Sequence, residues 1–233
     1  MKHNKDPPMY IMPFDPRLDA SPPAPAPQLP VREHILQAAC QVFAREGFDA
    51  ATVNGIAQQA GLPKPNVLYY FKSKDNLYAQ VLESIATPYL DACLSLHDDD
   101  QPVAALTRTV SAMVQLFERQ PFASKVFMVE LKEGATRLPP AYAERWAARV
   151  REHIERLGRW VDAGLLAPVD PRHLLLSTWA IAQSCISLGW QVPGLRGREQ
   201  LEAIDYAAAT QTATRLLVEG LTPVQPAAQR KRA

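Results

Sequence analysis

Apolar residues recur at helical spacing along most of the chain from Val31 onward. Short Gly, Pro, Asp or Asn punctuation separates these stripes, and the alternation typical of β-strands is almost absent. The pattern predicts an all-α body. Helices are expected over residues 31–46, 53–60, 64–71, 74–96, 102–119, 122–133, 139–163, 171–190 and 198–220.

The two ends of the chain lack this periodicity. Residues 1–30 contain nine of the 21 prolines and no helical spacing, which is typical of an extended, disordered arm. Residues 223–233 have the composition of a flexible tail. We therefore expect the folded part to begin at Val31 and to end near residue 222.

The first three predicted helices form a recognisable unit. Gly47 follows the first helix as a C-cap would, Thr52 is placed to cap a short second helix, and Gly61 ends that helix by allowing a positive φ. A tight turn then leads into a third helix. This order predicts a helix-turn-helix domain over residues 31–78, in which the last helix enters the major groove of DNA.

The third helix should bury one face and expose the other. Val67, Leu68 and Phe71 are expected to face the two preceding helices. The side chains left outside are Lys64, Pro65, Asn66, Tyr69 and Tyr70. Two adjacent exposed tyrosines have no evident role in folding, which favours a binding role for this face.

The exposed positions carry chemistry suited to DNA. Lys64 can donate to guanine, Asn66 can pair with adenine through two hydrogen bonds, and the ring of Pro65 can contact a thymine methyl. Ser73 is placed to cap the next helix, whose free N–H groups together with Lys74 would hold a phosphate.

Charge does not decide between this interpretation and a helical hairpin of purely structural use. The whole chain has a net charge of +1, and residues 31–80 contain five Arg and Lys against four Asp and Glu. The identities of particular residues have to decide.

Residues 31–85 resemble the N-terminal domain of TetR-family transcriptional repressors. The matching positions are Thr52, Ile56-Ala57, Ala60-Gly61, Phe71, Ser73-Lys74 and Leu77. The resemblance implies DNA-backbone contacts from Thr52, Tyr70 and Lys74, and groove contacts from Lys64, Pro65, Asn66 and Tyr69. Pro63 replaces the usual capping Ser and Leu68 replaces a phosphate-binding Tyr, so those two contacts should be absent.

The resemblance implies that residues 79–222 form a dimerising, effector-binding domain. Residues 118–135 and 158–183 are similar to the RutR-type branch, which implies an effector such as uracil or thymine held by Trp179 and Gln183. The segment "SCISLGWQV" that follows departs from that pattern.

The chemistry of this pair supports such a site independently. Trp179 and Gln183 lie one helical turn apart, so an indole and an amide project together, and a flat ring with N–H and C=O groups can use both. The alternative is a core Trp beside a Gln that bonds across the dimer. Further residues that can line a pocket, or simply fill the core, are Met113, Phe117, Phe127, Met128 and Trp160.

Other sites are weaker. The three cysteines are far apart and read as buried free thiols, Glu130 reads as a buried, paired carboxylate, and "HDDD" over residues 97–100 reads as helix capping rather than a metal site. We find no catalytic motif, and no cofactor is expected. No apolar run is long enough to cross a bilayer and no signal peptide is evident, so we expect a cytoplasmic protein.

The combined expectation is a homodimeric repressor that leaves a palindromic operator when a small effector binds. The long apolar helices at 171–190 and 198–220 are expected to form a two-fold four-helix interface. The alternatives are a helical enzyme or ligand carrier whose hairpin is only structural, and an adaptor that uses the proline-rich arm.

Overall fold

The computed structural model describes residues 30–97, 101–189, 191, 194 and 201–223, and its regular elements there are all helices. This confirms the all-α prediction, whereas the predictions for the proline-rich arm and for the tail lie outside the described residues. The helices are α1 (Val31–Ala50), α2 (Val53–Gln59), α3 (Lys64–Phe71), α4 (Lys74–Cys93), α5 (Pro102–Arg119), α6 (Pro121–Lys132), α7 (Pro140–Asp162), α8 (Pro171–Ser187) and α10 (Ala203–Leu221).

The punctuation of the helix-turn-helix unit lies where the sequence predicts it. Gly47 leaves helical geometry with φ 76° and ψ 175°, although helical residues resume after it up to Ala50. The Thr52 hydroxyl accepts a hydrogen bond from the backbone N–H of Gly55 at 3.0 Å, which caps α2. Gly61 has φ +62°, and Pro63 precedes α3 without any side-chain cap, as expected.

The buried face of α3 is narrower than predicted. Val67 and Phe71 are buried, but Leu68 is 36% exposed, so its assignment to the core is wrong. The reason is that α3 packs mainly against α2 and α4, and a residue adjacent to Val67 points about 100° away around the helix.

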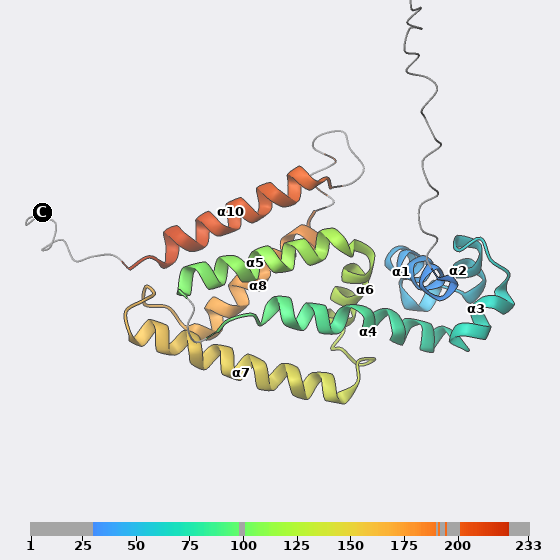
Figure 1. The fold of residues 1–233 in the computed structure, drawn as a ribbon, viewed down its shortest axis with the longest axis horizontal. Helices are drawn as coiled ribbons and strands as arrows, with labels where there is room; N and C mark the ends of the chain where they lie inside the picture. Colours follow the sequence, from blue (N-terminus) through green and yellow to red (C-terminus); the bar gives the residue numbers. More distant parts are fainter. Residues whose placement is uncertain (1–29, 98–100, 190, 192–193, 195–200, 224–233) are drawn as a thin grey trace, which may run out of the picture. The chain divides into compact units, whose positions relative to one another are not determined.

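Helix α4 links the helix-turn-helix unit to the remaining helices (Figure 1). It packs against α1 and α3 and also against α5 and α6, while α6 packs directly against α1. One continuous hydrophobic cluster runs from Ile35 on α1 to Leu221 at the end of α10. The helix-turn-helix unit and the remaining helices therefore share one hydrophobic core.

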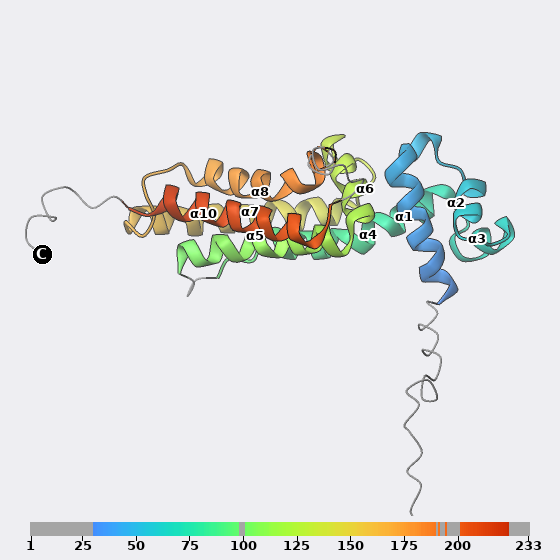
Figure 2. The same ribbon diagram turned by 90° about the horizontal axis from the view of Figure 1, so that it is seen from above.

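The C-terminal helices pack around α5 and α8. Helix α5 contacts α4, α6, α8 and α10, whereas α8 contacts α5, α6, α7 and α10. The view from above places α10 alongside α5 and α8 (Figure 2). Each of these helices therefore has a covered face, and α8 and α10 each keep a further face that no described helix covers.

Several predicted helix ends differ from the structure. Helix α1 continues to Ala50 rather than residue 46, and α8 ends at Ser187 rather than residue 190. Helix α4 stops at Cys93 rather than residue 96, because Leu94 turns out of helical geometry. The last helix starts at Ala203 rather than near residue 198. A capping box fixes that start, in which Asp205 accepts from the backbone N–H of Glu202 and the Glu202 side chain accepts from the backbone of Asp205.

The structure also bears on the expectations for the cysteines, for a membrane span and for the aspartates after α4. The three cysteines are free, with Cys93 and Cys185 buried and Cys40 half-buried, and burial raises the pKa of Cys40 to about 12. Among the described helices, none combines the length and the hydrophobicity needed to cross a membrane. The aspartates at 98–100 lie outside the described residues, so the structure does not test the capping role predicted for them.

Candidate DNA-binding surface and effector site

The exposed face of α3 carries the residues that the sequence singles out. Lys64, Pro65 and Asn66 are exposed in its first turn, and Tyr69 and Tyr70 are 72% and 41% exposed further along. The two tyrosine rings meet edge to face with centroids 5.2 Å apart. A hydrophobic core does not explain this exposed aromatic pair.

Lys72 adds a feature that the sequence reasoning missed. Its ammonium donates to the backbone oxygen of Tyr69 at 2.8 Å and lies 5.3 Å from the centre of that ring. A positive φ of 63° at Lys72 turns the chain so that this contact forms. The Lys72 side chain therefore packs against the exposed Tyr69 ring. The sequence F-K-S-K, which directly follows the two tyrosines, was the available signal for this contact.

Lys74 lies at the start of α4, and its ammonium group already has partners within the chain. Ser73 caps α4 by accepting from the backbone N–H of Asn76 at 3.1 Å. The Lys74 ammonium donates to the carbonyl oxygens of Phe48 and Asp49 at 2.9 and 3.3 Å, and it lies 4.4 Å from the centre of the Phe48 ring. Lys74 therefore ties the start of α4 to the end of α1 and has one further N–H to offer.

An aromatic cluster occupies the space between α4, α5, α6, α7 and α8. Its six members are Tyr89, Phe117 of α5, Phe127, Tyr142, Trp146 and Trp179. The Tyr89 ring stacks on Trp146 with centroids 5.8 Å apart, and Trp146 contacts Trp179 at 5.1 Å. Phe127 lies 5.1 Å from Tyr89 and 6.0 Å from Tyr142.

The predicted effector pair faces this cluster through hydrogen bonds to α4. The Trp179 indole N–H donates to the backbone oxygen of Cys93 at 3.0 Å, and the Gln183 amide N–H donates to the Tyr89 hydroxyl at 2.6 Å. Both bonds lie within one chain, so the Gln183 amide nitrogen does not need a partner across a dimer. Within the described residues, the Gln183 amide oxygen accepts no hydrogen bond.

Tyr142 introduces an unsatisfied polar group into the cluster. Its side chain is buried, and its hydroxyl has no hydrogen-bond partner within the described part of the chain. Burial raises the pKa of Tyr142, so the phenol stays protonated and can donate. A buried hydroxyl without a partner costs about 1–3 kcal/mol, which favours the view that another molecule completes this site.

The other residues predicted to line the effector site lie partly in the aromatic cluster and partly elsewhere in the core. Phe127 belongs to the cluster, and Met128 is its half-buried neighbour on α6. Trp160 is buried near the end of α7 but is not among the described ring contacts of the cluster, so the structure does not bring it to Trp179.

Sequence reasoning missed the three cluster members Tyr89, Tyr142 and Trp146. Tyr142 and Trp146 are one helical turn apart in the otherwise polar stretch of α7, which repeats the spacing of Trp179 and Gln183. That repeated spacing was the available signal.

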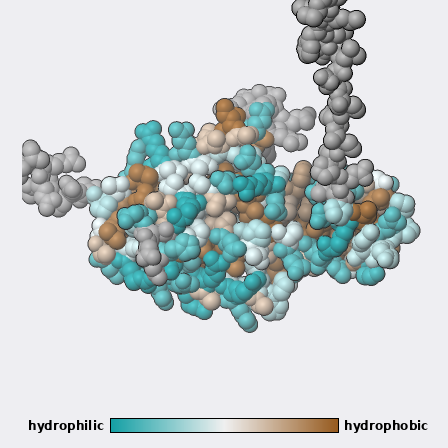
Figure 3. All heavy atoms as spheres, in the orientation of Figure 1, coloured by the Kyte–Doolittle hydropathy of each residue, from teal (hydrophilic) through white to brown (hydrophobic). Residues whose placement is uncertain are grey.

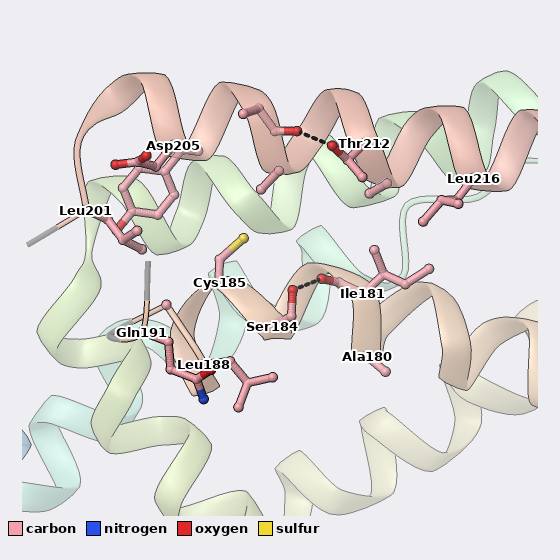
Figure 4. Close-up of a pocket in the computed structure, with 15 residues that line it drawn as sticks. Ala180, Ile181, Ser184, Cys185, Leu188, Gln191, Leu201, Asp205, Thr212 and Leu216 are labelled. Carbon is pink, nitrogen blue, oxygen red and sulfur yellow. Dashed lines mark hydrogen bonds between the residues drawn. The ribbon is translucent and has the colours of Figure 1, made fainter. Parts of the chain in front are cut away.

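A groove of about 750 Å³ lies on a different side of α8, between it and α10. Figure 4 shows its walls, with Ile181, Ser184 and Cys185 contributed by α8 and Asp205, Thr212 and Leu216 by α10. Trp179 and Gln183 do not line it. Figure 3 shows hydrophobic patches near both ends of α10 on a face that is otherwise mostly hydrophilic.

Comparison with known proteins gives matches over both halves of the chain. Residues 35–81 match the family model described as bacterial regulatory proteins, tetR family, and residues 82–224 match the model of the YcdC-like protein C-terminal region. The HTH-type transcriptional regulator RutR of Escherichia coli K12 is 31% identical over 192 residues, covering 82% of this chain and 91% of RutR. The HTH-type transcriptional repressor NicS of Pseudomonas putida is 34% identical over 91 residues, covering 39% and 43% of the two chains.

Solved structures share the fold. The putative transcriptional regulator SCO4942 of Streptomyces coelicolor aligns with a TM-score of 0.60 at 24% identity, over 84% of this chain and all of that one. AibR in complex with isovaleryl coenzyme A and operator DNA aligns with a TM-score of 0.58 at 18% identity, with the same coverage. With a helix-turn-helix unit at one end and a helical ligand-binding domain at the other, this chain belongs to the TetR family of bacterial transcriptional regulators.

Proposed function

We propose that this regulator is a repressor that binds a palindromic operator as a homodimer and releases it when a flat heterocyclic effector enters the aromatic cluster. Residues 31–78 would bind DNA, and residues 79–222 would bind the effector and the second subunit. The observation that carries the proposal is the unsatisfied polar chemistry inside the aromatic cluster. The Tyr142 hydroxyl is buried and has no hydrogen-bond partner within the described residues. The half-buried Gln183 side chain bonds to Tyr89 through its amide nitrogen, which leaves its oxygen available to a ligand.

On the DNA side, α3 would act as the reading helix. Lys64 and Asn66 suit guanine and adenine edges, and Pro65 and Tyr69 offer apolar contact to the groove. Contacts to the phosphate backbone would come from Thr52, Tyr70 and Lys74. The Thr52 hydroxyl can still donate to a phosphate, because its oxygen acts only as an acceptor in the α2 cap.

The effector we infer is a pyrimidine such as uracil or thymine. Such a ring can stack on the indoles of Trp146 or Trp179, donate its imide N–H to the Gln183 amide oxygen, and accept from the Tyr142 hydroxyl. The Tyr89 hydroxyl, already bonded to Gln183, would orient the amide. The alternative effector is another small aromatic or apolar molecule that uses only the stacking surface.

The dimer would form through α8 and α10. The uncovered face of α8 carries small or apolar side chains that include Leu176, Ala180 and Ser184, and the facing side of α10 carries Thr212 and Leu216. Small residues at this spacing allow two helices to approach closely. A two-fold axis here would place the α3 helices about 34–36 Å apart, which matches half-sites one DNA turn apart.

Light scattering tests this assembly. The protein should have the mass of a dimer at micromolar concentration, and Ala180→Glu, which puts a charge into the centre of the proposed contact, should shift it toward monomer. A wild-type monomer at that concentration would refute the interface.

Release requires only a modest coupling free energy. An effector shifts the equilibrium by no more than its difference in affinity for the two conformations. A tenfold loss of operator affinity corresponds to about 1.4 kcal/mol, which one well-formed hydrogen bond between ring and amide can supply.

A titration against the protein–operator complex tests the effector class. A duplex is first selected from random sequences with the wild-type protein, and uracil, thymine and 1,3-dimethyluracil are then added. The dimethyl compound keeps the ring but lacks both N–H donors. We expect release by uracil or thymine, little release by the dimethyl compound, and no release in Gln183→Ala.

The possible failures are separable. If no pyrimidine binds the free protein by calorimetry at millimolar concentration, the pyrimidine assignment is wrong and the DNA-binding proposal stands. Equal release by uracil and by its dimethyl derivative would support the alternative in which only stacking matters. If selection yields no preferred duplex, the operator-binding proposal fails.

A further inference from the structure

Glu130 is a fully buried carboxylate on α6 that contacts two other parts of the chain. One of its oxygens accepts from the Tyr78 hydroxyl of α4 at 3.2 Å, and the other accepts from the backbone N–H of Arg137, between α6 and α7, at 2.7 Å. The Arg137 guanidinium lies 3.6 Å from the same carboxylate. Both oxygens are therefore in use, and the charge is paired.

The same groups enclose Phe48 at the end of α1. The Arg137 guanidinium lies 4.4 Å from the centre of the Phe48 ring, the Lys74 ammonium lies 4.4 Å from it, and the Tyr78 ring lies 4.8 Å from it. Lys74 also donates to the Phe48 carbonyl. We call these five residues, Phe48, Lys74, Tyr78, Glu130 and Arg137, the Glu130 network.

The network lies one helical turn from the aromatic cluster. Phe127 precedes Glu130 by three residues on the 12-residue helix α6, and it contacts Tyr89 and Tyr142. Tyr78 and Tyr89 are both buried on α4. A shift of α6 that followed a change around Phe127 would carry Glu130 with it, because both side chains lie on the same short helix.

We propose that Glu130 is a positioning residue that holds the end of α1 and the Lys74 anchor in the DNA-binding arrangement and that transmits displacement of the aromatic cluster to them. The transmission to operator release rests on the function proposed above, whereas the positioning of α1 does not. A crevice of about 130 Å³ adjoins Phe48 and Tyr78, so Phe48 has space to move once the network loosens.

The carboxylate is suited to this task because it accepts with two oxygens. Glu130→Gln keeps the volume but leaves one acceptor oxygen, and its N–H₂ group would face the Tyr78 hydroxyl or the Arg137 N–H. Tyr78→Phe is the milder change, because it removes one hydroxyl and leaves the ring in contact with Phe48. The matched control is Glu133→Gln, which removes the same charge from an exposed position three residues along.

The first measurement is amide hydrogen exchange on the full-length protein without DNA. In Glu130→Gln and Tyr78→Phe, exchange should accelerate by about fivefold or more at residues 44–50 and 74–78, and it should be unchanged at residues 205–217 of α10. Glu133→Gln should match the wild type. A uniform acceleration over the whole chain, or none at residues 44–50, would overturn the proposal.

The second measurement tests transmission without any effector. Phe127→Leu changes the cluster, so it should accelerate exchange at residues 44–50 in the wild-type background and add nothing in the Glu130→Gln background. Additive effects would mean that the cluster and the end of α1 are independent.

Operator affinity is the third readout. It should fall about fivefold in Glu130→Gln and stay at the wild-type value in Glu133→Gln. Wild-type affinity in Glu130→Gln would reduce Glu130 to a purely structural role. A wild type that selects no operator would refute the proposed function, and the exchange measurements would still decide the positioning role.

Discussion

The unpaired hydroxyl of Tyr142 gives a single-atom test of the effector site. Tyr142→Phe removes a buried donor that has no described partner, so the free protein should be as stable as the wild type or more stable by about 1 kcal/mol. The same change should weaken binding of the effector. Urea unfolding and calorimetry with uracil measure the two effects.

The change in the free energy of unfolding shows whether the Tyr142 hydroxyl binds the effector or stabilises the fold. If Tyr142→Phe destabilises the free protein by more than about 1 kcal/mol, the hydroxyl has a structural partner, and its assignment to the effector is wrong. Phe127→Leu provides the comparison, because it alters the same cluster without removing a polar atom.

Asn66 gives the corresponding test on the DNA side. Its exposed amide lies in the first turn of α3, where a bidentate contact to adenine would contribute about 1–3 kcal/mol of discrimination. Asn66→Ala should therefore weaken binding to the selected operator and leave binding to random duplex unchanged. Gln115→Ala, which removes an exposed amide from α5, should change neither.

Fluorescence anisotropy with both duplexes at fixed salt measures these affinities, since protein–DNA affinity depends steeply on salt. Equal weakening on operator and random DNA would show that Asn66 contacts the backbone rather than a base.

At the scale of the element, the turn between α2 and α3 is expected to depend on the positive φ of Gly61. Gly220, which has no positive φ, serves as the comparison. Gly61 has φ +62°, so Gly61→Ala should cost about 1–2 kcal/mol even though a Cβ would meet nothing within 4 Å. Gly220 lies in the last turn of α10 with open space around it and without a positive φ. Gly220→Ala should stabilise by about 0.5–1 kcal/mol.

Thermal unfolding of the two variants checks these signs, and loss of operator binding should accompany only Gly61→Ala. Equal stability of both variants would mean that the turn is not fixed by the conformation of Gly61.

Helix α4 contacts three functional regions along its length. It begins with the cap at Ser73 and the Lys74 anchor, continues through Tyr78 in the Glu130 network, and ends with Tyr89 and Cys93 as the partners of Gln183 and Trp179. One helix, which has Pro88 inside it, therefore contacts the DNA-binding unit, the network and the aromatic cluster. The proposed coupling of the two sites would act through this helix.

At the scale of the whole molecule, a buried histidine makes stability depend on pH. The Nδ1 of His153 lies 2.8 Å from the backbone oxygen of Arg149, and its Nε2 lies 3.2 Å from the backbone N–H of Leu96, which joins α7 to the segment after α4. These partners require the neutral ring, with its proton on Nδ1. Burial, with a smaller contribution from nearby Arg156, lowers the pKa of His153 below its usual 6.5.

The sign follows from proton binding in the two states. Below about pH 6.5 the unfolded chain takes up a proton that the folded chain resists, so the free energy of unfolding should be highest above that pH and should fall as the pH is lowered. Urea unfolding at pH 8.0, 6.5 and 5.5 measures the change, and His153→Gln should show a smaller decrease. Equal stability of the wild type at pH 5.5 and 8.0 would contradict this role.

The sequence by itself determined the helices, most of their ends and the exposed face of α3. These features depend on local chemistry: a 3.6-residue period, Thr and Ser caps, and glycines that permit positive φ. The motifs from Thr52 to Leu77 were also dense enough to imply the TetR family, which the comparisons confirm. Leu68 was misjudged because the width of a buried face depends on how many helices cover it.

Only the tertiary structure decided which side chains meet. Nothing in the sequence pairs Gln183 with Tyr89, Trp179 with the Cys93 carbonyl, or Glu130 with Tyr78, because each contact joins residues more than 50 positions apart on different helices. It also showed that Lys74 binds the end of α1 and that Trp160 lies apart from the cluster's ring contacts. Periodicity reports which face of a helix is buried, but helix packing selects the neighbour, and packing depends on the whole core at once.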